Sequence, residues 1–528
     1  MLWADRIAGE IRDTRRPRNG KTFIIRDEKT LSGRVHVGSM RGVAIHGLIS
    51  EMLSEYDIAN EFRFELSDFD PFDSVPNYLD AEKFRKHLGK PLYTVPSPDP
   101  AFSNYAEYFG AEFIEVHEKA GFSPRYYRAT ELYQSGKMDS LIKIALKRAS
   151  DIRKILKEVS GSEKEESWLP ISVVCEKCGK MMTTSAHDFY PSTSLGAGGT
   201  VAYTCDGNGE IKGCGYSGRV APFSGAGKLF WKVDWAAKWV AHGVDIEGGG
   251  KDHSTRGGSR DVANHIAREI FNYEPPFDIP YEFFLVGGKK MSSSKGRGSS
   301  AKDMCDLFPP EVFRLALIGK DIREQIDVDP SGESVPKLYD WYDELANGVR
   351  EGKADDYSRL YALCELPQNR AGLSALWEMR FREVAFIVQM PHLELRKEAR
   401  KTKGSELTED EIQKLEERAR YAKFWLSTYA PEEFKYELQE EMPSFELSGV
   451  QKNALSTFTD FFQDAERTGE ELHLRLHELK TEIPIAPKEL FQAIYRIFLN
   501  RDSGPKAGWF LAGLPRDFVI VRLAEAIQ

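Results

Sequence analysis

The chain has 528 residues, of which 41% are hydrophobic and 29% charged, and its formal net charge is −10. This length predicts three or four domains, and the composition is typical of a globular protein. Six cysteines are too few for a disulfide framework, the first residues lack an apolar signal core, and no apolar run reaches the length of a membrane span. We therefore expect a cytoplasmic protein with no membrane partner, and exclude secreted disulfide-rich and membrane-spanning classes.

The first part of the chain predicts a parallel α/β unit. The stretch Thr22-Phe23-Ile24-Ile25 predicts a buried strand, and residues 30–39 predict a loop that opens into a helix. Apolar residues at three- and four-residue spacing between 44 and 56 indicate that helix. Alternating apolar and charged residues over 62–66 then predict a second strand. Strand, loop, helix and strand together place a ligand site at the strand ends.

A histidine and a glycine stand where this loop meets the helix, in the stretch His36-Val37-Gly38-Ser39. Imidazole and backbone N–H groups at a helix N-terminus, together with the helix dipole, can hold phosphate oxygens. A histidine in such a place is more often a cap or a packing residue, so His36 taken alone leaves both readings open.

A second distinctive stretch, residues 287–296, has the sequence GGKKMSSSKG. It follows the apolar run 283–286, so a buried strand is predicted to end in a positively charged loop. Glycine lets the backbone close on a ligand, and lysine supplies a point charge for the oxygens of a departing polyphosphate. Taken alone, the stretch is more typical of a solvent-exposed basic turn than of a ligand site, because short motifs often match by accident.

Four of the six cysteines form two groups, Cys175 with Cys178 and Cys205 with Cys214, and each group is followed by glycine. Four thiolates can complete a tetrahedral Zn²⁺ site, and the glycines allow tight turns that point N–H groups at sulfur. The second pair is widely spaced, so four unlinked buried thiols remain an alternative. Four protein ligands leave no open coordination position, and the predicted role of Zn²⁺ is therefore structural.

The two distinctive stretches resemble, in order and separation, the two signature motifs of class I aminoacyl-tRNA synthetases. The first is His36-Val37-Gly38-Ser39 and the second is Lys290-Met291-Ser292-Ser293-Ser294-Lys295. Further stretches make the chain resemble class I lysyl-tRNA synthetases, the form found in archaea and some bacteria, over residues 3–520. These stretches are residues 30–38, Val233-Asp234-Trp235, Gly250-Lys251-Asp252-His253 and Tyr281-Glu282-Phe283.

The chain departs from that family at three places. Leu31 stands where a proline is usual, Glu28 stands where many members have glycine, and Leu66-Ser67-Asp68 replaces an expected Trp-Asp-Asp. Glu28 and Ser67 border the amino-acid pocket that the resemblance implies.

The resemblance implies a mixed α/β fold. Its catalytic domain is a Rossmann-type doubly wound parallel sheet with a zinc-bearing insertion, and an all-α anticodon-binding domain, the helical cage, follows. The implied boundaries are 1–125 and 221–300 for the two halves of the catalytic domain, 126–220 for the insertion, 301–347 for a region that contacts the tRNA stem, and 348–528 for the anticodon-binding domain.

The resemblance also implies a lysine–tRNA ligase that uses ATP and Mg²⁺ to form lysyl-adenylate and then transfers L-lysine to tRNA(Lys), with adenylate formation waiting for tRNA. The implied catalytic residues are His36, Lys290 and Lys295. Lys295 is included because Ser293 stands where the family has its second lysine. The implied ATP-binding residues are Gly33, His36, Gly38, Ser39, Lys290, Met291, Ser292, Ser294 and Lys295. The implied amino-acid-binding residues are Glu28, Thr30, Gly33, Asp68, Asp234, Trp235, Asp252, His253 and Tyr281.

The ε-ammonium of lysine needs a carboxylate partner, because an unpaired charge in an apolar pocket is costly. Glu28, Asp68, Asp234 and Asp252 are candidates, and the sequence leaves the choice open. Three other functions also stay open: a class I synthetase for arginine or glutamate, a nucleotidyltransferase of the same superfamily, and a noncatalytic tRNA-binding relative. We expect a monomer.

The region after residue 309 is predicted to be helical. Thr408 and Glu411 have the spacing of a capping box, and an apolar stripe follows them. A basic cluster in this region is either a contact for the tRNA backbone or a solvated helix face. Its members are Arg396, Lys397, Arg400, Lys401 and Lys403.

Overall fold

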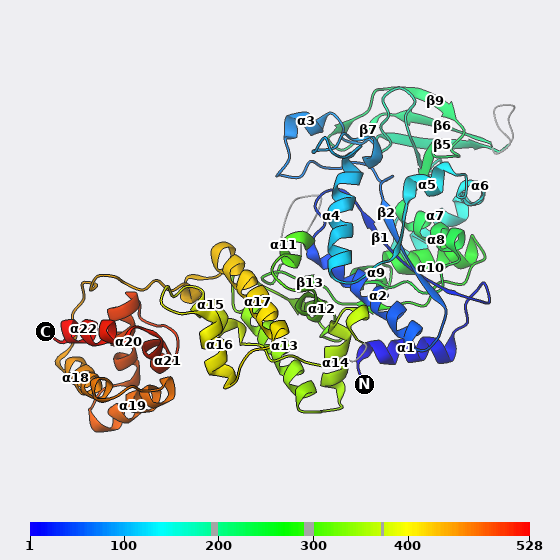
Figure 1. The fold of residues 1–528 in the computed structure, drawn as a ribbon. Coiled ribbons are helices and arrows are strands. Elements are labelled where there is room, and N and C mark those ends of the chain that lie inside the picture. Colours follow the sequence, from blue (N-terminus) through cyan, green and yellow to red (C-terminus); the bar gives the residue numbers. More distant parts are fainter. Residues whose placement is uncertain (192–198, 290–299, 371–373) are drawn as a thin grey trace. The chain divides into compact units, whose positions relative to one another are not determined.

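The computed structural model describes residues 1–191, 199–289, 300–370 and 374–528 (Figure 1). The chain folds into two compact units. The first comprises Met1–Val328 and Ala354–Leu373, and the second comprises Asp329–Lys353 and Ser374–Gln528. Within the described ranges, no helix combines the length and the apolar character that crossing a bilayer requires.

A parallel sheet forms the centre of the first unit. Strand β1 (Phe23–Thr30) pairs in parallel with β2 (Asn60–Ser67) along its whole length, and β2 pairs in parallel with β3 (Arg125–Arg128). On the other side of β1, parallel bridges join Ile25 to Ile246 and Ile246 to Phe277. The prediction of a mixed α/β chain with a parallel sheet is confirmed. The carboxyl ends of these strands share one edge, which is where ligands bind in sheets of this kind.

Helices α2 and α8 pack on opposite faces of β1. The chain passes from β1 through the short 3-10 helix η1 (Val37–Ser39) into α2 (Met40–Glu55). Asp27 reaches His46 of α2, with 3.3 Å between Asp27 Oδ2 and His46 Nδ1. The next residue, Glu28, reaches Lys238 of α8 (Trp231–His242), with 3.2 Å between Oε2 and Nζ. Adjacent strand residues point to opposite faces, so β1 supplies charged groups to both.

Short elements and further helices complete the first unit. Two short parallel pairs lie near the end of the sheet, β11 (Gly249–Gly250) with β12 (Pro280–Tyr281) and β13 (Phe284–Leu285) with β14 (Ile326–Asp327). The other helices of this unit are α1 (Trp3–Thr14), α3 (Ala81–Arg85), α4 (Tyr105–Lys119), α5 (Ala129–Gln134), α6 (Asp139–Lys147), α7 (Ala149–Ser160), α9 (Lys251–Ser254), α10 (Ser259–Glu269), α11 (Ala301–Cys305), α12 (Pro310–Ile318) and α14 (Asp356–Cys364).

An antiparallel lobe lies between the two halves of the parallel sheet in the sequence. Strands β4 (Ile171–Val173) and β10 (Gly227–Leu229) pair antiparallel and so bring the two ends of the lobe together. Inside it, β6 (Thr200–Cys205) pairs with both β5 (Thr184–Tyr190) and β9 (Ser217–Val220), and β7 (Gly207–Asn208) pairs with β8 (Ile211–Lys212).

In the described part of the second unit, every regular element is a helix. The capping box predicted for Thr408 and Glu411 is present, because Thr408 N–H donates to Glu411 Oε2 at 2.8 Å and Glu411 N–H donates to Thr408 Oγ1 at 3.3 Å. The α-helices are α13 (Ser334–Arg350), α15 (Phe381–Ile387), α16 (Leu395–Lys403), α17 (Glu409–Thr428), α18 (Gly449–Asp464), α19 (Gly469–Glu482), α20 (Pro487–Leu499), α21 (Ala507–Gly513) and α22 (Arg516–Ile527).

A buried arginine joins helices α13 and α17 within this unit. The side chain of Arg418 is 3% exposed and lies 2.8 Å from Asp343 Oδ1 and 2.7 Å from Glu378 Oε2. Replacing Arg418 with methionine leaves two largely buried carboxylates without this cation, so we expect the free energy of unfolding to fall by about 3–5 kcal/mol in urea titrations. The matched control is Arg420→Met on the same helix, whose side chain is 77% exposed and whose loss should cost less than about 1 kcal/mol. Equal losses in both variants would contradict this interpretation.

Candidate active site

Residues on both sides of the segment 290–299 contact the turn that carries His36. Ser300 forms an antiparallel bridge with His36, and Ala301 N–H donates to the carbonyl oxygen of Val35 at 2.7 Å. On the other side of the segment, β13 contacts η1, the turn that contains Gly38 and Ser39. The structure therefore brings the residues that flank the second motif to the turn that carries the first. The predicted site residues Lys290, Met291, Ser292, Ser294 and Lys295 lie outside the described residues.

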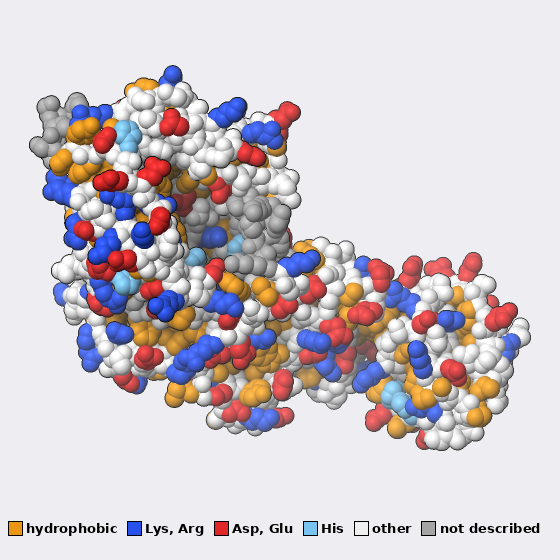
Figure 2. All heavy atoms as spheres, turned by 180° about the vertical axis from the view of Figure 1, so that it is seen from behind, with side chains coloured by type: hydrophobic (Ala, Val, Ile, Leu, Met, Phe, Trp, Pro, Cys, Tyr) orange, Lys and Arg blue, Asp and Glu red, His pale blue; other side chains and the backbone are white. Residues whose placement is uncertain are grey.

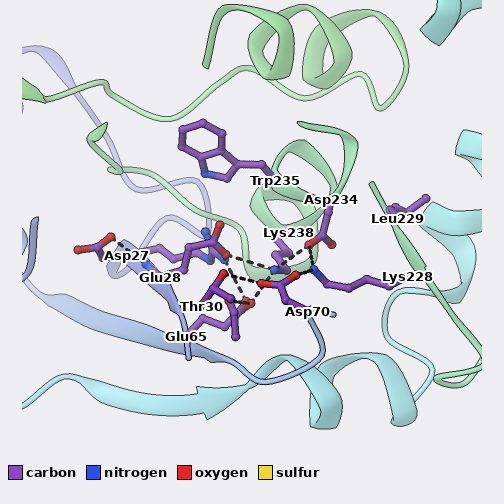
Figure 3. A network of polar contacts seen from close by, with 12 residues as sticks. Asp27, Glu28, Thr30, Glu65, Asp70, Lys228, Leu229, Asp234, Trp235 and Lys238 are labelled. Atoms are coloured by element: carbon purple, nitrogen blue, oxygen red, sulfur yellow. Dashed lines mark hydrogen bonds and ion pairs between the residues drawn. The ribbon is translucent and has the colours of Figure 1, made fainter. Parts of the chain in front are cut away.

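Next to this turn, a network of buried charges connects β1, β2 and α8 (Figure 3). The guanidinium of Arg26 is fully buried and contacts three carboxylates, with distances of 2.5 Å to Glu28, 2.9 Å to Glu65 and 2.8 Å to Glu247. Its Nε also donates to the hydroxyl of Tyr127 at 2.8 Å. Arg26 thus ties neighbouring strands together through side chains instead of backbone groups.

Two lysines enter the same network from β10 and α8. Lys238 Nζ lies 2.6 Å from Glu65 Oε1, 2.8 Å from Asp234 Oδ2 and 3.2 Å from Glu28 Oε2. Lys228, which follows Gly227 in β10, contacts Asp70 and lies 3.2 Å from Asp234 Oδ2. The network therefore extends without a break from Glu247 to Asp70.

The network carries more negative than positive charge. Its three cations, Arg26, Lys228 and Lys238, face five carboxylates, which are Glu28, Glu65, Asp70, Asp234 and Glu247. Burial alone would raise the pKa of Glu65, but Lys238 and Arg26 hold that pKa well below its usual range, so Glu65 stays ionised. Burial raises the pKa of Glu247, and the charge of Arg26 opposes that rise. Among the described residues, the carboxylate of Glu247 accepts hydrogen bonds only from N–H donors, those of Arg26, Trp235 and Trp239, which matches an ionised carboxylate.

The excess negative charge is accessible at two residues. The side chains of Glu28 and Asp70 are 13% and 23% exposed, whereas those of the other three carboxylates are at most 2% exposed. Thr30 Oγ1 donates to Asp70 Oδ2 at 2.5 Å, and Lys228 contacts Asp70 Oδ1. Glu28 uses Oε2 for both Arg26 and Lys238. Among the described residues, no hydrogen bond to Glu28 Oε1 is found, so this oxygen can accept one from a ligand.

An aromatic wall borders the network. Trp231 stacks on Trp235 with ring centroids 4.7 Å apart, and His253 lies edge-on to Trp235 at 5.9 Å. Trp235 is buried and its Nε1 donates to Glu247 Oε1 at 2.8 Å. His253 and Asp252 on α9 are 41% and 44% exposed, so they stand at the solvent side of this wall.

Two predicted amino-acid-binding residues have their contacts elsewhere. Asp68 accepts hydrogen bonds from the backbone N–H and the hydroxyl of Thr130 near the start of α5, and therefore serves as a cap. The hydroxyl of Tyr281 and the carboxylate of Asp27 both approach Gly42 of α2, each 2.7 Å from where a Cβ would stand. Burial, followed by the charge of Asp27, raises the pKa of Tyr281 well above its usual value. Gly33 lies in the loop between β1 and η1.

Six network residues were not foreseen from the sequence: Arg26, Glu65, Asp70, Lys228, Lys238 and Glu247. Two signals were available. The charged run Arg26-Asp27-Glu28-Lys29 directly continues an apolar strand, which is unusual for a buried element. Asp234 and Lys238 have the i, i+4 spacing of a helical ion pair, and they form one.

The four cysteines predicted as metal ligands converge in the antiparallel lobe. The sulfur atoms of Cys175 and Cys214 are 3.6 Å apart, those of Cys178 and Cys205 are 3.7 Å apart, and all four lie within 4.8 Å of one another. Gly179 and Gly215 both have φ of +71°, and their N–H groups donate to the carbonyl oxygens of Cys175 and Cys205. The other two cysteines, Cys305 and Cys364, are buried.

The basic cluster on α16 is largely paired with acidic side chains. Arg400, Lys401 and Lys403 lie 3.1, 2.8 and 2.6 Å from Glu406, Glu398 and Glu411. Arg396 likewise contacts Glu416. This pairing favours a solvated helix face. Positive and negative side chains are also interspersed over the face of the molecule drawn in Figure 2.

Comparisons with known proteins show which family the chain belongs to. The family model described as "tRNA synthetases class I (K)" matches residues 1–369. The chain is 35% identical over 549 residues to lysine–tRNA ligase 1 of Methanosarcina acetivorans, with 100% of this chain and 98% of that protein covered. It is 31% identical over 530 residues to the lysine–tRNA ligase of Archaeoglobus fulgidus, with both chains fully covered. The chain therefore belongs to the family of class I lysyl-tRNA synthetases.

Proposed function

We propose that this chain joins L-lysine to the 3′ end of tRNA(Lys) in two steps. In the first step, a carboxylate oxygen of lysine attacks the α-phosphorus of ATP, a P–O bond forms, and the bond to the leaving pyrophosphate breaks. In the second step, the terminal ribose 2′-hydroxyl of the tRNA attacks the lysyl carbonyl carbon and AMP leaves. Neither step needs a covalent enzyme nucleophile, so the protein contributes positioning and charge stabilisation.

The observation that carries this proposal is the excess negative charge of the network, open to solvent at Glu28. Three buried cations cannot neutralise five carboxylates, and a ligand ammonium at Glu28 Oε1 would reduce the excess. We therefore assign Glu28 as the partner of the lysine ε-ammonium and Asp70 as the second exposed carboxylate of the pocket. The other two buried candidates already have partners. Asp68 accepts a hydrogen bond from Thr130, and Asp234 is paired with Lys228 and Lys238.

The other amino-acid-binding residues would surround the rest of the substrate. The indole of Trp235 and the imidazole of His253 would form the wall against which the aliphatic part of the substrate lies. Thr30 would hold Asp70 in place through its hydrogen bond. Asp252 stands at the solvent side, where it can contact the α-ammonium. Tyr281 lies with Asp27 beside Gly42 on the α2 face of β1, so it would support the pocket from behind and would not contact the substrate. A glutamate substrate would be repelled by this pocket, which disfavours a glutamate-specific synthetase.

ATP would bind where the His36 turn meets the segment 290–299. His36, the backbone N–H group of Gly38, the side chain of Ser39 and the loop at Gly33 would hold it from one side. Lys290, Met291, Ser292, Ser294 and Lys295 would hold it from the other. When bound, Mg²⁺ would reduce the negative charge of the phosphates. The contact between Ser300 and His36 supports this assignment, because it places the residue that follows the segment beside the turn.

The finer domain assignment is part of this proposal. Residues 126–220 would be the zinc-bearing insertion of a doubly wound catalytic domain, 301–347 would contact the tRNA stem, and 348–528 would be the anticodon-binding helical cage. The all-helical second unit disfavours a small-molecule nucleotidyltransferase. Retention of His36, Lys290 and Lys295 disfavours a noncatalytic relative.

The sulfur cluster fits a structural Zn²⁺ ion. Four thiolates at about 2.3 Å from Zn²⁺ have tetrahedral edges of about 3.8 Å, and two sulfur pairs are 3.6 and 3.7 Å apart. The hydroxyl of Thr183 lies 3.2 Å from the sulfur of Cys205, so it can donate a hydrogen bond to a thiolate. Cys175, Cys178, Cys205 and Cys214 would hold the ion and stabilise the antiparallel lobe.

Removing one ligand tests this assignment. We expect the purified chain to contain about one Zn²⁺ and Cys178→Ser to contain almost none by elemental mass spectrometry, with faster amide exchange across residues 171–229. Cys305→Ser, which changes a buried cysteine outside the cluster, should keep its metal. A parent chain without zinc, or a Cys178→Ser variant that keeps it, would contradict the assignment.

The activity itself is tested by charging. The chain is incubated with ATP, Mg²⁺, labelled lysine and tRNA, and label in acid-precipitable RNA is counted. We expect label that depends on ATP and that mild base removes, because the product is an ester. Base-labile label from arginine but not from lysine would instead support an arginine-specific synthetase.

A further inference from the structure

Lys238 is the residue of the charge network whose role remains to be assigned. Its side chain is 2% exposed and its ammonium lies within 3.2 Å of three carboxylates, those of Glu65, Asp234 and Glu28. An ammonium has three N–H donors, so all of them are used. Lys238 is therefore held in place by carboxylates from β1, from β2 and from its own helix. Its ammonium has no N–H donor left for a substrate.

We propose that Lys238 is a positioning residue that sets specificity for lysine by fixing the carboxylate of Glu28. The inference rests on the proposed function, because it assigns the ε-ammonium to Glu28. Lys238 does not touch the substrate and acts only through Glu28.

The geometry at Glu28 carries the argument. Its Oε2 accepts from two cations, Arg26 Nη2 at 2.5 Å and Lys238 Nζ at 3.2 Å. These two donors come from different elements, β1 and α8. The last torsion of a glutamate side chain is broad and roughly twofold. One donor would let the carboxylate rotate about that torsion, whereas two donors on one oxygen hold Oε1 towards the ligand.

Arg26 alone would not give this orientation. Its Nη2 is shared between Glu28 and Glu65 Oε2, 2.9 Å away, and it stands on the same strand as Glu28. If the charge of Lys238 is removed, Glu65 and Asp234 each lose a partner inside the protein. Arg26 is then the remaining cation for Glu65, so its interaction with Glu65 strengthens and its interaction with Glu28 weakens. The expected consequence is a poorer site for an ammonium, with the reacting groups around ATP unchanged.

The test measures lysine-dependent ATP–pyrophosphate exchange in the presence of tRNA with saturating ATP. For Lys238→Met, which removes the charge and keeps most of the side chain, we expect the lysine KM to rise about tenfold or more while kcat stays within about threefold. Lys238→Arg, which keeps a cation, should restore the KM to within about threefold of the parent. Lys232→Met on the same helix is the matched control and should leave both constants unchanged.

A double-mutant cycle separates positioning from a general effect on the fold. If Lys238 acts through Glu28, Lys238→Met added to Glu28→Gln should change the lysine KM by less than about twofold. Independent effects that multiply, or an unchanged KM in a folded Lys238→Met variant, would overturn the inference. If Lys238→Met does not fold, Lys238→Gln and Lys238→Arg supply the same comparison. Failure of the proposed function is distinguishable, because then the parent chain itself would show no lysine-dependent exchange.

Discussion

Glu28→Gln should raise the lysine KM about 100-fold in ATP–pyrophosphate exchange, with a much smaller change in kcat. Glutamine keeps the size of the side chain but removes the negative charge that we assign to the ε-ammonium. Loss of one partner of a buried, hydrogen-bonded charge pair costs about 2–5 kcal/mol, which spans roughly 30-fold to several-thousand-fold in affinity. We expect KM to change and kcat to change much less, because the ε-ammonium of the substrate has the same charge before and during the reaction.

The matched control for this variant is Glu61→Gln. Glu61 stands near the amino end of β2, opposite to the proposed site, and is paired with Arg63 at 2.7 Å and Arg125 at 3.1 Å. It should leave the lysine KM unchanged. A Glu28→Gln variant with the lysine KM of the parent would remove Glu28 from substrate binding and return the choice to Asp70 or Asp252.

Lys295→Ala should lower kcat at least about 100-fold and leave the lysine KM within about threefold. The ammonium is assigned to the triphosphate, whose leaving oxygens gain negative charge in the transition state, so its removal slows the chemical step. Single-turnover formation of adenylate, followed by rapid quench, measures this step directly.

Lys302→Ala is the control for this second variant. Lys302 follows the same segment closely in the sequence but is paired with Asp306 at 2.7 Å and with Glu115 at 3.3 Å. Its loss should leave kcat within about threefold of the parent. Equal turnover in Lys295→Ala and in the parent would exclude this lysine from catalysis and direct attention to Lys290.

Several features follow from local sequence and could be predicted. Apolar strands separated by an amphipathic helix gave the parallel sheet, because periodicity is a local property. The cysteine spacing gave the sulfur cluster. The pairing of the His36 turn with the segment 290–299 came from the family resemblance and stays a prediction, because that segment lies outside the described residues. The residue that follows it, Ser300, forms a bridge with His36.

The charge network could not be predicted in the same way. Arg26 and Glu65 are fully buried in strands, where apolar residues are the normal expectation, and only their pairing across elements makes this tolerable. That pairing depends on the parallel register, in which Glu28 is opposite Glu65. Asp68 and Asp70 in the loop after β2 look alike in sequence, yet one caps α5 and the other meets Lys228. Long-range contacts of this kind are not encoded in local periodicity.

The most direct measurement is ATP–pyrophosphate exchange with each of the twenty amino acids in turn, with and without tRNA. If the network selects an ammonium through Glu28, exchange in the presence of tRNA should occur with lysine and be at least about 100-fold weaker with arginine, glutamate and the neutral amino acids. Exchange that does not depend on lysine, or that is supported by another amino acid equally well, would contradict the assignment of this chain as a lysine-activating enzyme.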